Sequence, residues 1–365
     1  MELKSSKPEW IPDEFDKEVA GKVIEGYVPA IRNSKKVNKR SSYNIDELSN
    51  GILEGNTTIL SKAITLVESN APKHIELTQS LLKKILPYSG NSIRIGITGP
   101  PGAGKSTFIE SLGNFLTDNN QNVAVLAIDP SSTITGGSIL GDKTRMEILS
   151  RKENAFIRPS PSGGTLGGVA KKTKETILLC EAAGYNIILI ETIGVGQSEI
   201  TVRSLVDLFL LILLPGSGDE LQGIKKGVVE LSDLLFVNKC DGEFTDRANI
   251  TKANYSSALR LLQSPTDGWK PKLLTGSAIS NKGIEKVWST INEFMINTKS
   301  SGVFDKRRNE QNITWIYTLL NEYINNKYFN NKKFKHDKID VENALLQNII
   351  TPTEAVDKLI HIIGL

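Results

Sequence analysis

Short apolar runs alternate with amphipathic stretches from about residue 93 to about residue 297. The runs cover residues 93–98, 123–128, 187–190, 208–214 and 234–237, and glycines or polar residues follow each of them. Such runs are typical of parallel strands that are buried on both faces, with helical crossovers between them. The pattern predicts an α/β fold, a three-layer domain with a mainly parallel sheet that residues 284–296 close as a helix.

Helical periodicity marks both flanks of this region. Residues 52–86 carry apolar positions at helical spacing, namely Leu60, Ala63, Ile64 and Val67. Near the other end, two helical stripes lie on either side of an Asn/Lys-rich hinge at residues 325–335. The stripes are Trp315, Leu319, Leu320 and Tyr323, and then Val356, Leu359, Ile360 and Ile363. We expect a helical amino-terminal extension (1–90), an α/β domain (91–298) and a carboxyl-terminal helical dimerisation segment (299–365).

Composition narrows the class of protein. The 365 residues include 44 Lys and Arg against 41 Asp and Glu, a net charge of +3, which argues against nonspecific binding of nucleic acid. The basic run at residues 32–40 is interpreted as a solvated loop. Cys180 and Cys240 share no ligand spacing with the histidines, so neither a disulfide framework nor a zinc site is indicated. No apolar run approaches the ~20 residues of a membrane span. We expect a cytoplasmic protein with no membrane or nucleic-acid partner.

A glycine-rich segment joins the first strand to helical sequence. It has the spacing of a phosphate loop, in which backbone N–H groups converge on the β-phosphate at a helix amino terminus. Lys105 supplies a positive charge for the β- and γ-phosphates, and Ser106 offers a hydroxyl to Mg²⁺. The predicted nucleotide-binding residues are Gly99, Pro100, Pro101, Gly102, Ala103, Gly104, Lys105, Ser106 and Thr107.

A second motif, Asn238-Lys239-Cys240-Asp241, follows the strand at residues 234–237. A carboxylate there can accept both the ring N–H and the exocyclic amine of guanine, whereas adenine presents its donor and acceptor differently. Ser277, Ala278 and Ile279 follow a further short strand, where a backbone N–H can meet the guanine carbonyl. The two motifs together predict binding of GTP or GDP rather than ATP.

Acidic residues between the two motifs are candidate metal ligands. Asp129 and Glu191 end predicted strands, and Asp142 lies in Gly141-Asp-Lys-Thr-Arg145. Carboxylates at strand carboxyl ends face the nucleotide crevice, so Ser106, Asp129, Asp142 and Glu191 form the predicted Mg²⁺ site. For Asp142 a loop cap is the alternative.

Two further features bear on hydrolysis. Gly194 is placed to sense the γ-phosphate, but Val195 follows it where other GTPases carry a glutamine that orients water, so intrinsic hydrolysis should be slow. The glycine-rich loop at residues 215–227 can deliver Lys225 or Lys226 to the phosphates, unless it is simply a solvent-exposed loop.

Taken together, these motifs resemble the MeaB/ArgK family of GTPases, which includes the methylmalonic aciduria type A protein. The resemblance covers roughly residues 50–300, and Cys240 stands where the family usually has alanine. Its motifs are the phosphate loop, Ala127-Ile-Asp129-Pro-Ser-Ser132, Gly141-Asp142-Lys-Thr-Arg145-Met146, Glu191-Thr-Ile-Gly194-Val-Gly-Gln197-Ser-Glu199, the 215–227 loop and Asn238-Lys-Cys-Asp241.

The resemblance implies a homodimeric GTPase chaperone of an adenosylcobalamin-dependent acyl-CoA mutase, chiefly methylmalonyl-CoA mutase. The chaperone would gate cofactor loading and protect the mutase from inactivation. By the same resemblance, Lys105 and Glu191 serve catalysis, and Lys225 joins them when the mutase binds.

Three other functions stay open. A metal-delivery GTPase would need His-rich tracts or closely spaced cysteines, which the chain lacks. An ATP-dependent kinase of arginine and ornithine transport would need ATP, which Asn238 and Asp241 disfavour. The third is a scaffold that binds GTP without useful turnover.

Overall fold

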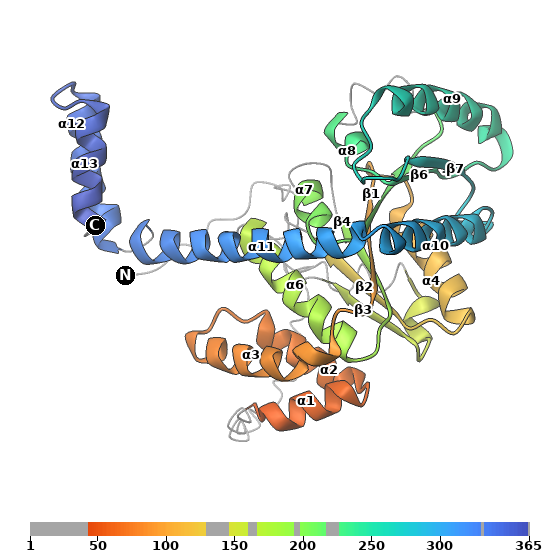
Figure 1. Ribbon diagram of the computed structural model, residues 1–365, viewed down its shortest axis with the longest axis horizontal. Helices are drawn as coiled ribbons and strands as arrows, with labels where there is room; N and C mark the ends of the chain where they lie inside the picture. Colours follow the sequence, from red (N-terminus) through yellow and green to blue (C-terminus); the bar gives the residue numbers. More distant parts are fainter. Residues whose placement is uncertain are drawn as a thin grey trace, which may run out of the picture. The chain divides into compact units, whose positions relative to one another are not determined.

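A computed structural model describes residues 43–128, 146–159, 166–192, 198–216, 226–329 and 332–363. The chain divides into two units, Met1–Tyr43 and Asn44–Leu365, and the fold below is that of the second. Its described residues form one parallel sheet of seven strands in the order β3-β2-β4-β1-β5-β6-β7 (Figure 1). The strands are β1 (Ile93–Thr98), β2 (Val123–Ile128), β3 (Ala155–Pro159), β4 (Ile187–Thr192), β5 (Leu208–Leu213), β6 (Leu234–Val237) and β7 (Lys272–Thr275).

The sheet confirms the predicted α/β class and adds a strand. β3 pairs in parallel with β2, Val123 opposite Ala155, and lies at the sheet edge. It contains Arg158 and ends at Pro159, so its sequence carries none of the apolar continuity of the central strands. An edge strand tolerates such residues because only one side of it pairs.

Helices cover both faces of the sheet. α4 (Lys105–Asp118) and α10 (Ile284–Ser300) bury their apolar faces in one core with β1, β2, β4, β5 and β6. On the other face, α6 (Leu166–Ala182) contacts β2, and α7 (Ser198–Arg203) contacts β1 and β4. The described residues of this part also form η2 (Leu149–Arg151), α8 (Lys226–Glu230), η4 (Gly242–Phe244) and α9 (Thr245–Leu261).

Between residue 43 and the sheet lie three helices, α1 (Ile45–Leu53), α2 (Thr57–Val67) and α3 (Pro72–Ile85), followed by the 3-10 turn η1 (Leu86–Tyr88). Asn44 and Asn56 begin the first two by accepting backbone N–H groups at 3.0 Å, as helix-capping residues do. The predicted stripe of α2 is buried, and both α2 and α3 pack against α6.

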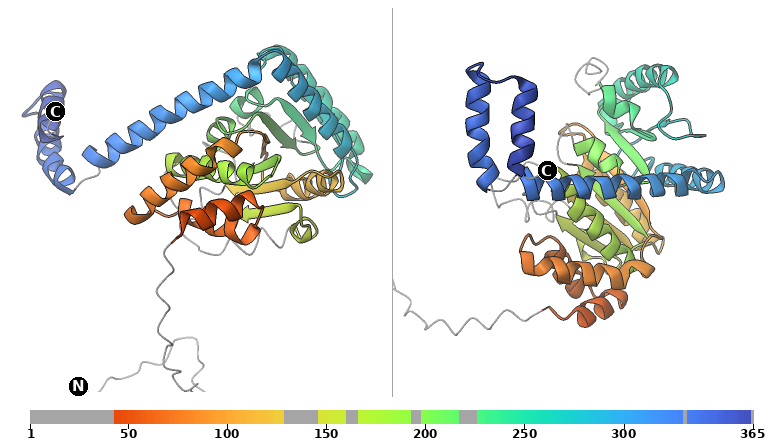
Figure 2. Two further views of the ribbon diagram at one scale, coloured as in Figure 1. Left: turned by 60° about the horizontal axis from the view of Figure 1, so that its bottom comes forward. Right: turned by 60° about the vertical axis from the view of Figure 1, so that its left-hand side comes forward.

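The carboxyl-terminal region differs from its prediction. α11 (Val303–Ile324) continues into a π-helical turn, η5 (Asn325–Phe329), and α12 (Lys332–Leu346) begins inside the expected hinge. α12 was not predicted, because Lys, Asp and Asn dilute its apolar positions. It forms a helical hairpin with α13 (Pro352–Ile363), visible in Figure 2.

The prediction of which apolar residues α13 buries is also partly wrong. Ala355, Leu359 and Ile362 pack on Val341 of α12, whereas Val356 and Ile360 are 53% and 41% exposed. The unpredicted partner helix decides which face is buried. None of the helices in the described part of the chain has the length and apolar character that crossing a membrane requires.

Candidate nucleotide site

The phosphate loop joins β1 to α4 at the carboxyl edge of the sheet. β1 lies between β4 and β5, and the later strands continue on the β5 side, so the loop opens where the strand order reverses. Ligands of open α/β sheets bind at such a switch point. The geometry therefore places the predicted loop at the expected crevice.

Two glycines make the close packing of this loop possible. A β-carbon on Gly99 would lie 2.4 Å from the carbonyl oxygen of Ile212 on β5. Gly104 caps α4 in the left-handed conformation (φ +83°), and a β-carbon there would lie 2.7 Å from Nδ2 of Asn238. Larger residues would push the loop off both neighbours, so the glycines set its height above the sheet.

Lys105 folds back over the loop. Its Nζ donates to the carbonyl oxygens of Gly99 at 2.9 Å and Pro100 at 3.2 Å. Burial lowers the pKa of Lys105 below its ordinary value, and the nearby carboxylates of Glu191 and Glu199 oppose that shift. The ammonium group is thus held among acceptors at the mouth of the loop, where a phosphate would meet it.

Ser106, in the first turn of α4, meets Glu191 near the carboxyl end of β4. Residue Glu191 pairs with Ile97 across β1 and β4, and Ser106 Oγ donates to its Oε1 at 3.0 Å. A hydroxyl and a buried carboxylate are the hard oxygen donors that Mg²⁺ prefers, so the residues present fit that ion. In the described ranges no group of three or more His, Cys, Asp or Glu residues is arranged to hold a metal.

Several predicted residues lie outside the described ranges. They are Asp129, Asp142, Gly194, Val195 and Lys225. Their parts in the site stay predictions from sequence.

The residues predicted to bind the base come together from the ends of β6 and β7. Asn238 Nδ2 donates to the carbonyl of Ala103 at 2.9 Å, and its Oδ1 accepts the backbone N–H of Ala278 at 2.9 Å. Asn238 therefore connects the phosphate loop to the second loop directly. In this structure the Ala278 N–H is engaged by Asn238, while Ile279 beside it is 77% exposed.

Asp241 is oriented by a residue from that second loop. Ser277 Oγ donates to Asp241 Oδ2 at 2.8 Å, and the Asp241 side chain is exposed where a base can reach it. Lys239, between Asn238 and Asp241 in the sequence, adopts a left-handed backbone conformation (φ +58°). Cys240 turns inward, donating to the carbonyl of Val237 at 3.0 Å, so it does not face the base.

The structure adds one residue that the sequence analysis did not assign. Glu199, on α7, is 1% exposed and acts electrostatically on Lys105. Its only signal in the sequence is its place in Gln197-Ser-Glu199, which by itself gives no hint that it is buried beside the phosphate loop.

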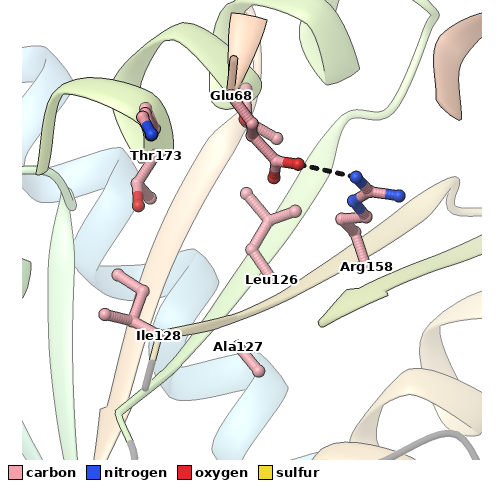
Figure 3. Close-up of a pocket in the computed structure, with 8 residues that line it drawn as sticks. Glu68, Leu126, Ala127, Ile128, Arg158 and Thr173 are labelled. Carbon is pink, nitrogen blue, oxygen red and sulfur yellow. Dashed lines mark hydrogen bonds and ion pairs between the residues drawn. The ribbon is translucent and has the colours of Figure 1, made fainter. Parts of the chain in front are cut away.

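A small cavity lies at the carboxyl end of β2 (Figure 3). Its volume of about 10 Å³ holds about one water molecule. Glu68, the residue after α2, pairs there with Arg158 of β3 at 2.6 Å. Burial raises the pKa of the Glu68 carboxyl, and Arg158 opposes the shift. The cavity is too small for a nucleotide. The ion pair between Glu68 and Arg158 instead connects the amino-terminal helices to the edge strand β3.

The fold and these contacts define a phosphate-loop NTPase whose second motif is of the guanine-reading type. A family model described as "Methylmalonyl Co-A mutase-associated GTPase MeaB" matches residues 60–333. The chain belongs to this family of phosphate-loop GTPases, and it is a GTPase.

Individual proteins similar to this chain carry names of the same family. The chain is 44% identical over 326 residues to the mitochondrial methylmalonic aciduria type A homolog of Mus musculus, covering 87% of this chain and 79% of that one. It is 48% identical over 273 residues to GTPase ArgK of Escherichia coli (75% and 82%). A crystal structure described as an LAO/AO transport system kinase aligns with a TM-score of 0.73 and 37% identity, covering 89% of this chain and 100% of that one.

Proposed function

We propose that this GTPase is Mg²⁺-dependent and serves as the chaperone of an adenosylcobalamin-dependent acyl-CoA mutase of the methylmalonyl-CoA mutase type. In this role it gates cofactor loading and protects the mutase from inactivation. The observation that carries the proposal is the match to a family described by its association with that mutase. The match spans residues 60–333, so it includes helices on both sides of the sheet as well as the nucleotide loops.

The residues at the phosphate loop and its neighbouring strands have different roles in hydrolysis. Lys105 neutralises charge on the β- and γ-phosphates, and Ser106 and Glu191, with Asp129 and Asp142, would hold Mg²⁺. Mg²⁺ supplies charge stabilisation to the phosphates when it is bound. Because Val195 cannot orient water, we propose that binding of the mutase brings Lys225 of the 215–227 loop to the phosphates and so completes the site.

We also propose that the protein is a homodimer. α11 exposes five large apolar side chains to solvent, a set that favours burial against a second copy: Ile313, Ile316, Tyr317, Leu320 and Tyr323. Analytical ultracentrifugation of the wild type and of Ile316→Asp tests this. We expect a dimer that the variant shifts to monomer, and a monomeric wild type would contradict the proposal. The buried free thiols of Cys180 and Cys240 support a reducing, cytoplasmic location.

The second candidate is an ATP-dependent kinase of arginine and ornithine transport. Its support is the description of the similar crystal structure as an LAO/AO transport system kinase. The orientation of Asp241 by Ser277 favours guanine, so nucleotide selectivity separates the two candidates.

Complex formation tests the chaperone proposal. Purified protein is mixed with a purified methylmalonyl-CoA mutase and separated by size-exclusion chromatography with no nucleotide, with GDP and with a non-hydrolysable GTP analogue. We expect a complex whose stability differs between the nucleotide states, and Lys105→Ala should remove that difference. If no complex forms in any of the three conditions, the mutase is not the client.

A further inference from the structure

The guanine loop, residues 277–282, is closed at its base. Ser277 N donates to the carbonyl of Lys282 at 3.0 Å, and Lys282 N donates back to the carbonyl of Ser277 at 3.0 Å. Within the turn, Asn281 takes a left-handed backbone conformation (φ +56°), which Asn tolerates better than most residues. The loop is therefore a short turn whose shape is fixed by its own backbone.

Close packing holds the base of this turn on β6. Phe236 lies against the positions of Gly276 and Gly283, and a β-carbon on Gly276 would fall 2.8 Å from the ring. The same ring packs on Phe108 of α4, with a centroid separation of 5.0 Å. The base of the loop thus rests on the helix that begins with Lys105 and Ser106.

One polar contact joins the far end of the loop, at Asn281, to that helix. Ser111 Oγ on α4 donates to Asn281 Oδ1 across 170 residues of sequence. Ser111 is only 7% exposed, and a buried hydroxyl within a helix often bonds instead to a carbonyl of its own preceding turn. The Ser111 hydroxyl donates to the loop instead.

We propose that Ser111 and Asn281 are positioning residues for guanine selectivity. They would set the distance between the phosphate loop, carried at the start of α4, and the loop that meets the guanine carbonyl. Asn238 makes the other such connection, from Ala103 to Ala278, but it holds the near end of the turn, whereas Ser111 holds the far end. The N–H groups of Ser277, Ala278 and Lys282 are engaged within the protein, so the donor that the two held ends would direct at the base is the backbone N–H of Ile279.

The test uses Ser111→Ala, because alanine suits a helix and removes only the hydroxyl. Affinities are measured by fluorescence competition for GTP, for 6-thio-GTP and for ITP, without any mutase. 6-Thio-GTP replaces the guanine carbonyl oxygen by a weaker acceptor, and ITP keeps that oxygen but lacks the 2-amine that Asp241 reads.

We expect Ser111→Ala to lower the affinity for GTP about three- to tenfold, which is the effect of losing one hydrogen bond. The preference for GTP over 6-thio-GTP should fall by a similar factor, and the preference for GTP over ITP should not change. Asn281→Asp, which keeps the acceptor oxygen, should bind like the wild type. Ser289→Ala, an exposed serine of α10 whose hydroxyl donates to the Lys286 carbonyl of its own helix at 3.0 Å, is the matched control and should also bind like the wild type.

Three results would overturn the proposal. One is an equal loss of affinity for GTP and 6-thio-GTP in Ser111→Ala, which would mark a general structural defect. Another is no loss for either nucleotide. The third is a wild type that binds the two equally, so that the turn does not read the carbonyl at all. Because no mutase is present, each of these leaves the chaperone proposal untouched.

Discussion

Arg308 on α11 and Asp207, the residue before β5, form a two-point ion pair. Arg308 Nε donates to Asp207 Oδ1 at 2.9 Å, and its Nη2 donates to Oδ2 at 2.8 Å. The aspartate is 1% exposed and also accepts the backbone N–H of Arg94 at 2.8 Å. This pair anchors the start of the carboxyl-terminal helices to the amino ends of the central strands, opposite the nucleotide loops.

Removing one partner of this pair should be costly. In Arg308→Met the carboxylate of Asp207 stays buried without its counter-charge, and we expect the free energy of unfolding to fall by about 3 kcal/mol. Urea unfolding followed by tryptophan fluorescence measures it. The exposed pair Lys338–Glu342 is the control, since Lys338→Met should cost less than about 0.5 kcal/mol. Equal effects of the two substitutions would contradict the anchor.

Lys105→Ala should abolish GTP turnover. The side chain is the positive charge at the mouth of the phosphate loop, and we expect a loss of at least about 100-fold. Lys105→Arg keeps the charge but not the point-like ammonium, and it should fail as well. Phosphate release at saturating GTP measures both variants. An unchanged rate in Lys105→Ala would remove the site assignment.

Asp241→Asn should change which nucleotide is preferred. The amide can no longer accept both guanine donors, whereas its own N–H can donate to the additional carbonyl of xanthine. We expect affinity for GTP to fall and affinity for xanthosine triphosphate to rise above it. Competition binding with both nucleotides measures the switch, and the structure supports it by orienting Asp241 through Ser277. Unaltered preference for GTP would show that this carboxylate does not read the base.

Lys174 on α6 should give stability a dependence on alkaline pH. It donates to Asn312 Oδ1 at 2.9 Å and lies over the Trp315 ring, and burial, with a smaller contribution from Arg94, lowers its pKa to about 8. From about pH 8 to the unfolded pKa near 10.4, the unfolded chain keeps a proton that the folded chain has released, so this residue's contribution to stability rises with pH.

Melting temperatures of the wild type and of Lys174→Met between pH 7.5 and 10.5 test this effect. The wild type should gain stability relative to the variant as pH rises through that interval. A difference between the two proteins that is constant with pH, or that moves in the opposite direction, would exclude a depressed pKa at Lys174.

The parts of the site that the sequence predicts are those set by strand order. Ser106 follows β1 and Glu191 lies near the carboxyl end of the adjacent parallel strand β4, so the motifs predict that they share one edge of the sheet. In the structure Ser106 Oγ lies 3.0 Å from Glu191 Oε1. The same logic brings Asn238 to the phosphate loop. Central strands that are buried on both faces have unbroken apolar runs in the sequence, so the core of the sheet was predictable.

Contacts between distant segments were not predictable in this way. Arg308 and Asp207 lie 101 residues apart, and the sequence around each residue does not indicate which residue it pairs with. Ser111 and Asn281 look like an ordinary helix serine and an ordinary loop asparagine. β3 lacks the apolar continuity of a buried strand, and the buried face of α13 depends on α12, a helix with few apolar residues. Each of these features is decided by tertiary packing rather than by local sequence.

The most direct test of the account is GTP turnover by the purified protein, measured alone and with a purified adenosylcobalamin-dependent methylmalonyl-CoA mutase, with ATP as the control nucleotide. We predict a slow rate with GTP, no turnover of ATP, and a clear increase in the GTP rate when the mutase is added. A GTP rate that the mutase leaves unchanged, with GTP bound normally, would contradict the chaperone role and point to another client.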